Sequence, residues 1–227
     1  MKTAVKTLIK RNSLFYILFL IWFLITGIVS LCFPKDVSFC WINHHLHSTK
    51  VDLFFTFATF CGSEFLVPML IGIFIFMKNK KLLIGLIQGL IVSGLIAQIL
   101  KHLFRYPRPA LYFHNAAMVK APHWITLYYY YSFPSGHTTA IFAVATLVSL
   151  FFSDKRSLTV FCFIIACLVA YSRIYLGEHF LEDVWLGSFI GTFCGTICFA
   201  VQQHITKQML FKKEERILVP SSENRSL

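Results

Sequence analysis

An uncharged apolar run near the start of the chain limits what this sequence can fold into. Residues 12–34 contain no Asp, Glu, Lys or Arg, and most of them are Leu, Ile, Phe, Val or Trp. As a helix, such a run is long enough to cross the roughly 30 Å hydrocarbon core of a bilayer. A secretory signal would have a shorter apolar run and a small-residue cleavage site, and neither is present around residues 30–34. The run is therefore predicted to be an uncleaved membrane span.

Further apolar runs follow along the whole chain. Its 227 residues are 57% hydrophobic and only 14% charged, a composition that soluble domains of this length do not have. The predicted spans are residues 14–34, 53–77, 82–101, 135–153, 157–173 and 183–204. The predicted fold class is all-α, a polytopic membrane helical bundle with six transmembrane helices. We expect one six-span domain at residues 1–206 and a polar cytoplasmic tail at residues 207–227.

The second apolar run is interrupted by the segment Cys61–Phe65. We expect a short surface helix that ends near Gly62, followed by the span itself, with Ser63 as its N-cap and Glu64 in its first turn. This interpretation keeps Glu64 at the membrane interface. The alternative is that Glu64 is a functional carboxylate at membrane depth, which the sequence leaves open.

Small residues recur every four positions in the third and the sixth predicted spans. Such ridges let helix backbones approach closely in lipid, so they predict packing contacts rather than chemistry. The ridge residues are Gly85, Gly89, Ser93 and Ala97 in one span and Gly187, Gly191 and Gly195 in the other.

The net charge of +11 comes from short basic clusters between the apolar runs. A basic protein attracts nucleic acid, but this distribution is typical of cytoplasmic loops. We therefore expect the lipid bilayer, and no nucleic acid, as a partner. Both termini are expected to be cytoplasmic, with three loops facing outward at residues 35–52, 102–134 and 174–182.

Polar side chains gather at the predicted outward ends of the spans. They include cations, imidazoles, a hydroxyl and a carboxylate, all on one membrane face. Charges near a bilayer are costly, and neighbouring cations repel each other unless an anion lies among them, so the set predicts a phosphate-like ligand. The residues are Lys101, Arg108, Ser135, His137, Arg173, His179 and Asp183.

The spacing of these residues suits an anion and a nucleophile. The segment PSGH opens a helix, whose free N–H groups favour an anion, and Gly136 lets the backbone approach it. His179 and Asp183 are four residues apart on a helix, so the carboxylate can orient the imidazole. This is the arrangement of a nucleophile with its orienting partner, and His137 is then free to act as a general acid.

Three further histidines, His44, His45 and His47, resemble a metal cluster by their number. With no acidic or thiol partner nearby in the sequence, we interpret them as a solvated loop. No metal site and no cofactor is predicted.

Three segments of the chain resemble the signature motifs of a known family. They are KHLFRYPRP at Lys101–Pro109, PSGH at Pro134–His137 and SRIYLGEHFLED at Ser172–Asp183. Together they are similar to the motifs of the type 2 phosphatidic acid phosphatase family, also called the lipid phosphatase and haloperoxidase superfamily. Their order and the predicted six-span setting cover nearly the whole chain, in the manner of the bacterial integral-membrane lipid phosphatases.

The resemblance implies a metal-independent phosphatase that acts through a phosphohistidine. His179 would attack phosphorus, oriented by Asp183, and His137 would protonate the leaving oxygen. The residues implied to bind the phosphoryl oxygens are Lys101, Arg108, Ser135, Gly136 and Arg173. Four residues beside the motifs, His102, Arg105, Glu178 and Glu182, receive no role.

The resemblance also implies a substrate class, a membrane lipid phosphate. Lipid A and undecaprenyl pyrophosphate are favoured over phosphatidic acid and phosphatidylglycerophosphate. A lipid phosphotransferase using the same site is the main alternative, followed by a vanadium haloperoxidase and a non-enzymatic lipid-phosphate transporter. We expect an integral protein of a bacterial inner membrane whose active site faces the periplasm or the exterior.

Overall fold

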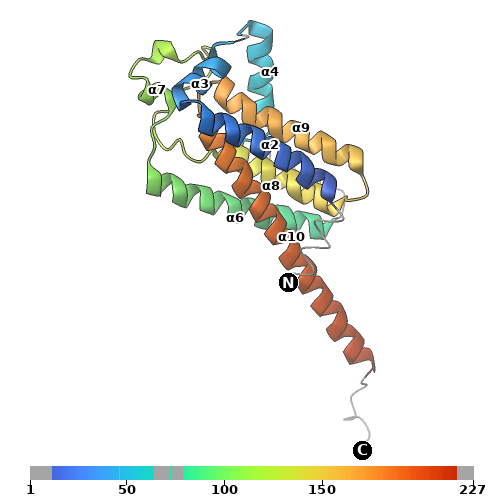
Figure 1. The fold of residues 1–227 in the computed structure, drawn as a ribbon. Coiled ribbons are helices and arrows are strands. Elements are labelled where there is room, and N and C mark those ends of the chain that lie inside the picture. The colour runs from blue at the N-terminus through green and yellow to red at the C-terminus, as the bar shows by residue number, and fades with distance from the viewer. Residues whose placement is uncertain (1–11, 46, 64–71, 73–78, 219–227) are drawn as a thin grey trace, which may run out of the picture.

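The chain folds as a bundle of helices (Figure 1). The structure is a computed structural model that describes residues 12–45, 47–63, 72 and 79–218. No strand occurs in these segments. The helices are α2 (Ser13–Cys32), α3 (Lys35–His44), α4 (Thr49–Phe60), α6 (Lys80–Phe104), α7 (Pro109–Tyr112), the 3-10 helix η1 (Ala116–Met118), α8 (Gly136–Phe151), α9 (Arg156–Tyr175) and α10 (Leu181–Leu218).

Four described segments are long and apolar enough to cross a membrane. They are Ser13–Cys32, Lys80–Tyr112, Arg156–Tyr175 and Leu181–Thr206. Helix α8 is apolar but has only 16 residues, or about 24 Å of helix. The described part of the chain therefore fits an all-helical membrane bundle with five apolar helices.

The second predicted span, residues 53–77, is described only at its beginning. Helix α4 ends at Phe60, close to the predicted interruption near Gly62. Residues 64–71 and 73–78 lie outside the described residues, and so does Glu64. The sixth span and the position of Glu64 stay predictions.

Helix α8 is the central helix of the bundle. It packs against α6, α9 and α10, and Figure 1 shows it among them. Residues 138, 139 and 141–150 of α8 are all buried. A helix that is surrounded in this way is apolar on every face, which explains its composition.

The ridges of small residues lie where α6 and α10 meet α8, as predicted. A side chain added at Gly191 would lie 2.9 Å from the backbone nitrogen of Ala143 and closer still to the carbonyl oxygen of Thr139. One added at Gly89 would lie 2.5 Å from Leu147 Cδ1. Only residues without a bulky side chain allow these helices to approach so closely.

The three segments predicted as outward loops meet at one end of the bundle, but the first of them, residues 35–52, is mostly helix α3 and the start of α4 and not a loop. Asn43 Nδ2 donates hydrogen bonds of 2.8 Å to the carbonyl oxygens of Lys120 and Tyr175, and Asn43 Oδ1 accepts one from Lys120 N. Lys35 also pairs with Glu182 across 3.8 Å. These contacts join residues 35–52, 102–134 and 174–182 into one polar cap, which we call the loop end.

The histidines near residue 45 do not form the solvated loop that the sequence suggested. His47 Nδ1 lies 2.9 Å from Asp52 Oδ1, and its side chain is largely buried, so the acidic partner is five residues away along the chain. His44 and His45 bond instead to the carbonyl oxygens of Met118 and Trp41. Within the described segments, no group of three or more His, Cys, Asp or Glu residues is placed to hold a metal.

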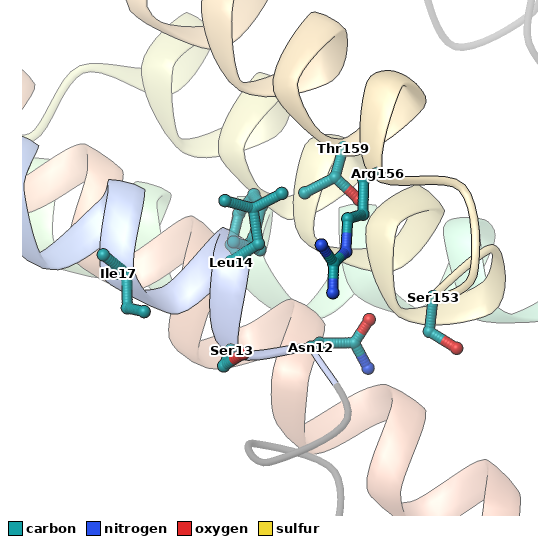
Figure 2. A pocket seen from close by; sticks show the side chains of 8 residues that line it. Asn12, Ser13, Leu14, Ile17, Ser153, Arg156 and Thr159 are labelled. Atoms are coloured by element: carbon teal, nitrogen blue, oxygen red, sulfur yellow. The ribbon is translucent and has the colours of Figure 1, made fainter.

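The opposite end of the bundle, which we call the basic end, carries the described basic clusters. A hollow of about 330 Å³ opens there between the beginnings of α2 and α9. Figure 2 shows Arg156 extending toward Asn12 beside it. Helix α10 runs through residue 206 without a break and ends at Leu218, so the predicted domain boundary at 206 does not coincide with a helix end.

Candidate active site

A buried histidine and aspartate lie at the loop end, where α10 begins. His179 Nδ1 lies 3.2 Å from Asp183 Oδ2, and each residue is 1% exposed. His179 lies in the turn between α9 and α10 and not, as the sequence had suggested, on the helix with Asp183, but the predicted contact between the two side chains is present. Because Nδ1 faces the carboxylate, it carries the proton, and the lone pair is on Nε2.

Ser132 fixes the carboxylate of this pair, and sequence reasoning gave it no role. Its hydroxyl donates a 2.5 Å hydrogen bond to Asp183 Oδ2 and lies 3.5 Å from His179 Nδ1. The backbone N–H of Phe180 donates to the same oxygen across 2.9 Å. The carboxylate oxygen Oδ2 therefore has three partners, while the other oxygen, Oδ1, is buried and has no hydrogen-bond partner among the described residues.

The beginning of α8 lies beside this pair. Ser135 N donates a 3.0 Å hydrogen bond to the carbonyl oxygen of Asp183, which joins α8 to α10. Ser135 Oγ accepts from Thr138 N and from Thr138 Oγ1, so its own hydrogen remains available to a ligand. A side chain added at Gly136 would meet nothing within 4 Å. His137 follows as the second residue of the helix, and no hydrogen bond of its imidazole occurs among the described residues.

Three cations surround the pair, each held by a different set of contacts. Lys101 Nζ donates to the carbonyl oxygen of Tyr131 across 3.0 Å, and Arg108 Nε donates to that of Tyr130 across 3.0 Å. Arg173 Nη1 donates to Thr59 Oγ1 across 2.7 Å, which brings α4 to the site. The loop from residue 128 to 132 therefore positions two of the three cations through its backbone.

Glu178 links the two arginines. Its Oε2 forms an ion pair with Arg108 Nη1 and lies 3.5 Å from Arg173 Nη2. The side chain is only 2% exposed. This residue precedes the candidate nucleophile, His179, and its contact with both arginines was not predicted.

The site has more hydrogen-bond donors than its own acceptors satisfy. Arg173 Nε is buried and has no partner among the described residues, although buried donors almost always have one. Together with the free hydrogen of Ser135 and the open side of Gly136, this donor fits an oxygen-rich anion. These residues lie around a common centre formed by α6, α8, α9 and α10.

The environment keeps the imidazole of His179 neutral. Burial lowers the pKa of His179 well below its ordinary value, and the charges of Arg108, Arg173 and Lys101 act in the same direction. A neutral imidazole with its lone pair on Nε2 can act as a nucleophile.

The structure thus brings the predicted site residues to one end of one bundle. Hydrogen bonds connect Ser135, His179 and Asp183, and Glu178 connects Arg108 with Arg173. Lys101 is connected to the site by its hydrogen bond to the backbone of the loop at residue 131. Gly136 and His137 are connected to it because they begin helix α8, which Ser135 caps. Sequence reasoning missed Ser132, Glu178 and Thr59. Only Glu178 gave a signal, by its place within the third motif.

Comparison with known proteins places the chain in a family. The model of the PAP2 superfamily matches residues 82–207, which contain all the predicted site residues. Dolichyldiphosphatase 1 of Dictyostelium discoideum is 30% identical over 183 residues, covering 74% of this chain and 72% of that protein. Undecaprenyl-diphosphatase of Sulfolobus acidocaldarius is 29% identical over 154 residues, covering 66% and 71%.

A solved structure agrees with this match. The crystal structure of Aquifex aeolicus LpxE superposes with a TM-score of 0.63 and is 34% identical in sequence. The superposition covers 71% of this chain and 92% of that one. The family model spans more than half of the residues of this chain. The chain belongs to the PAP2 superfamily.

Proposed function

We propose that this protein hydrolyses a phosphomonoester or pyrophosphate group of a membrane lipid through a phosphohistidine on His179. The observation that carries the proposal is the buried His179–Asp183 pair beside three cations. A neutral nucleophile next to an anion site is what phosphoryl transfer to histidine requires. The dolichyl and undecaprenyl diphosphatases named above support the same reaction class.

In the first step, the lone pair of His179 Nε2 forms a bond to phosphorus as the bond from phosphorus to the lipid oxygen breaks. His137 gives a proton to that oxygen, and the negative charge of the bound phosphoryl group stabilises its protonated form against the neighbouring cations. Asp183 stabilises the positive charge that develops on His179. In the second step, water attacks the phosphohistidine and gives a proton to His137, the P–N bond breaks, and inorganic phosphate is released.

The other predicted residues bind the phosphoryl oxygens in this scheme. Arg108 and Arg173 each offer a planar fork of donors, and Lys101 adds a compact charge. Ser135 donates its free hydrogen, and Gly136 leaves room for an oxygen beside the helix N-terminus. No residue of the scheme needs a metal, so activity should persist in EDTA.

The substrate class follows from the position of the site among apolar helices. A lipid whose hydrocarbon tail stays in the bilayer can present its phosphate there, so soluble phosphates should be poor substrates. Among the lipids considered, undecaprenyl pyrophosphate and lipid A are favoured, and the two diphosphatases support the prenyl pyrophosphate. Phosphatidic acid and phosphatidylglycerophosphate are less favoured.

The sidedness is part of the proposal. The basic clusters lie at the end opposite the site, and basic loops stay in the cytoplasm. The active site then faces the periplasm or the exterior of a bacterial inner membrane, with both termini in the cytoplasm. Cysteines introduced at residues 110–125 should react with an impermeant thiol reagent in intact cells. Labelling only after lysis would contradict this topology.

The reaction is tested with the purified protein and radiolabelled lipid phosphates, supplied singly and in pairs. We expect free phosphate from one lipid in the presence of EDTA, and its loss by several orders of magnitude in His179→Ala. His204→Ala, which changes an exposed histidine at the basic end, serves as the matched control. Label that appears on a second lipid would identify a phosphotransferase, and full activity in His179→Ala would refute the mechanism.

A further inference from the structure

Glu178 occupies the position between the two arginines that the proposed function gives to the phosphoryl group. Its Oε2 pairs with Arg108 Nη1 and lies 3.5 Å from Arg173 Nη2. Arg108 Nη1 also lies 3.5 Å from the backbone oxygen of the same glutamate. The forks of both arginines are therefore turned toward a carboxylate of the chain itself.

Other charged and titratable groups face this carboxylate from all the surrounding elements. The cations outnumber the anions, so one carboxylate does not neutralise the site. Arg173 on α9, Arg108 between α6 and α7 and Lys101 on α6 act directly on this carboxylate. His137 on α8, His179 in the turn after α9 and Asp183 on α10 lie near the same cations.

A phosphoryl dianion bound by the two arginines would be repelled by an ionised Glu178. Two like charges in contact repel strongly at the effective dielectric of a protein site. The side chain of Glu178 is 2% exposed, so little water reaches it to screen the repulsion. Either the carboxylate leaves the arginines or it loses its charge when a phosphate binds.

We propose, resting on the phosphatase function above, that Glu178 is an internal competitor of the phosphoryl group. Its ionised carboxylate closes the Arg108–Arg173 pair in the empty enzyme, and it takes up one proton from solvent when phosphate binds. The protonated side chain then donates a hydrogen bond to a phosphoryl oxygen instead of repelling it. Glu178 thus sets how tightly the enzyme holds a phosphate and makes that affinity depend on pH.

The surroundings of the carboxylate favour this proton uptake. Burial raises the pKa of Glu178, against the opposing effect of Arg173 and Arg108. A phosphate that takes over the two arginines removes that opposing effect. The acid form is then favoured by burial and by the charge of the phosphate together.

The test measures binding of inorganic phosphate to the purified full-length protein across pH. Glu178→Gln keeps the size of the side chain and removes its charge. We expect this variant to bind phosphate about tenfold more tightly than the unaltered protein near pH 8, and less than twofold more tightly near pH 5. The protonation of inorganic phosphate itself changes with pH, but it is the same for both proteins at any one pH. The ratio of the two Kd values therefore measures the effect of Glu178.

Two further variants make the result decisive. Glu182→Gln removes a carboxylate four residues away that pairs with Lys35 and is one-third exposed, and its Kd should stay within twofold of the unaltered protein. Glu178→Asp keeps the charge and should keep the pH dependence, even if the glutamine variant folds poorly. Phosphate binding that is equal or weaker in Glu178→Gln, with the same pH dependence, would overturn the proposal.

Failure of this inference differs from failure of the proposed function. If the unaltered protein releases phosphate from a lipid but its Kd is insensitive to Glu178, only the role of Glu178 is wrong. If it neither binds phosphate nor releases it from any lipid, the phosphatase function fails and the inference fails with it.

Discussion

Two arginines lie near opposite ends of helix α9, and their surroundings differ. Arg156 is the first residue of the helix and is exposed beside the hollow at the basic end (Figure 2). Arg173 lies near the last turn, is 7% exposed and contacts Thr59 and Glu178. The same residue type is thus solvated at one end and enclosed by partners at the other.

The difference shows where the fold buries a charge at a cost in stability. A buried charge is destabilising unless it is paired and hydrogen-bonded, whereas an exposed arginine at a membrane surface costs little. Arg173 still has an unpaired Nε after its described contacts are counted. The loop end therefore holds its charge through specific contacts, and under the proposed function substitutions there should affect catalysis far more than those at the basic end.

The largest effect expected from this comparison is that of Arg173→Ala. Removal of one preorganised charged donor typically lowers the rate of the chemical step by about 10²–10³, so we expect kcat/KM for the lipid phosphate to fall by that factor. Arg156→Ala, on the same helix, should stay within twofold of the unaltered protein. Steady-state phosphate release by both variants in one detergent measures the difference.

A lysine variant makes this prediction sharper. Arg173→Lys keeps the charge but loses the planar fork, so it should recover only part of the activity. Equal losses in Arg173→Ala and Arg156→Ala would show that the two ends of α9 do not differ in function.

A smaller loss is expected for Ser132→Ala. The variant removes the 2.5 Å hydrogen bond that holds Asp183 Oδ2, without touching the phosphate-binding cations. A hydrogen bond to a charged group contributes about 1.5–3 kcal/mol, so kcat should fall by roughly 10- to 100-fold. KM should change little, because Ser132 positions the orienting carboxylate and does not contact substrate. A rise in KM with unchanged kcat would assign Ser132 to binding instead.

The sequence predicted the parts of the site that depend on local spacing and on helix ends, and it missed the parts that depend on contacts between distant segments. Apolar runs located α2, α6, α8 and α9 and the beginning of α10 to within a few residues, but they missed α3, which forms within a predicted loop, and the extension of α10 to Leu218. The second span lies largely outside the described residues. Helix ends on one membrane face were enough to bring Lys101, Arg173 and His179 together. The four-residue spacing placed His179 beside Asp183, although His179 lies in the turn before α10 and not on the helix as predicted.

The missed residues depend on contacts between distant segments. Ser132 lies in a loop without periodicity, and its role exists only because residue 183 comes to lie beside it. Thr59 meets Arg173 across 114 positions of the chain. The partner of His47 was missed for a different reason, since Asp52 lies close in sequence but the turn between them sets their distance. No local pattern encodes such pairings.

Helix packing below the site gives a prediction about stability. A methyl group added at Gly191 of α10 would collide with the backbone of α8, at the Thr139 oxygen and 2.9 Å from the Ala143 nitrogen. Backbone atoms cannot move aside easily, so Gly191→Ala should destabilise the fold by about 1–3 kcal/mol. Gly94→Ala is the matched control, since nothing lies within 4 Å of the added methyl group on α6. Thermal unfolding in detergent should show a lower Tm for Gly191→Ala only, and equal Tm values would contradict the close approach of α8 and α10.

The smallest expected effect is the pH dependence of stability, which also separates the two ends. Burial lowers the pKa of His179 in the folded protein, and the neighbouring cations lower it further. Below the ordinary histidine pKa of about 6.5, the unfolded chain binds a proton at this position that the folded chain does not bind. The folded state without substrate therefore loses up to about 1.4 kcal/mol of stability per pH unit as the pH falls below that value.

His179→Gln removes this proton-binding group, so the Tm of the variant should fall less steeply between about pH 7 and pH 5 than that of the unaltered protein. His204→Gln, which changes an exposed histidine at the opposite, basic end of the bundle, is the matched control and should leave the slope unchanged. Equal slopes in all three proteins would mean that His179 is not kept neutral by the fold, which would remove the electrostatic basis for its role as a nucleophile.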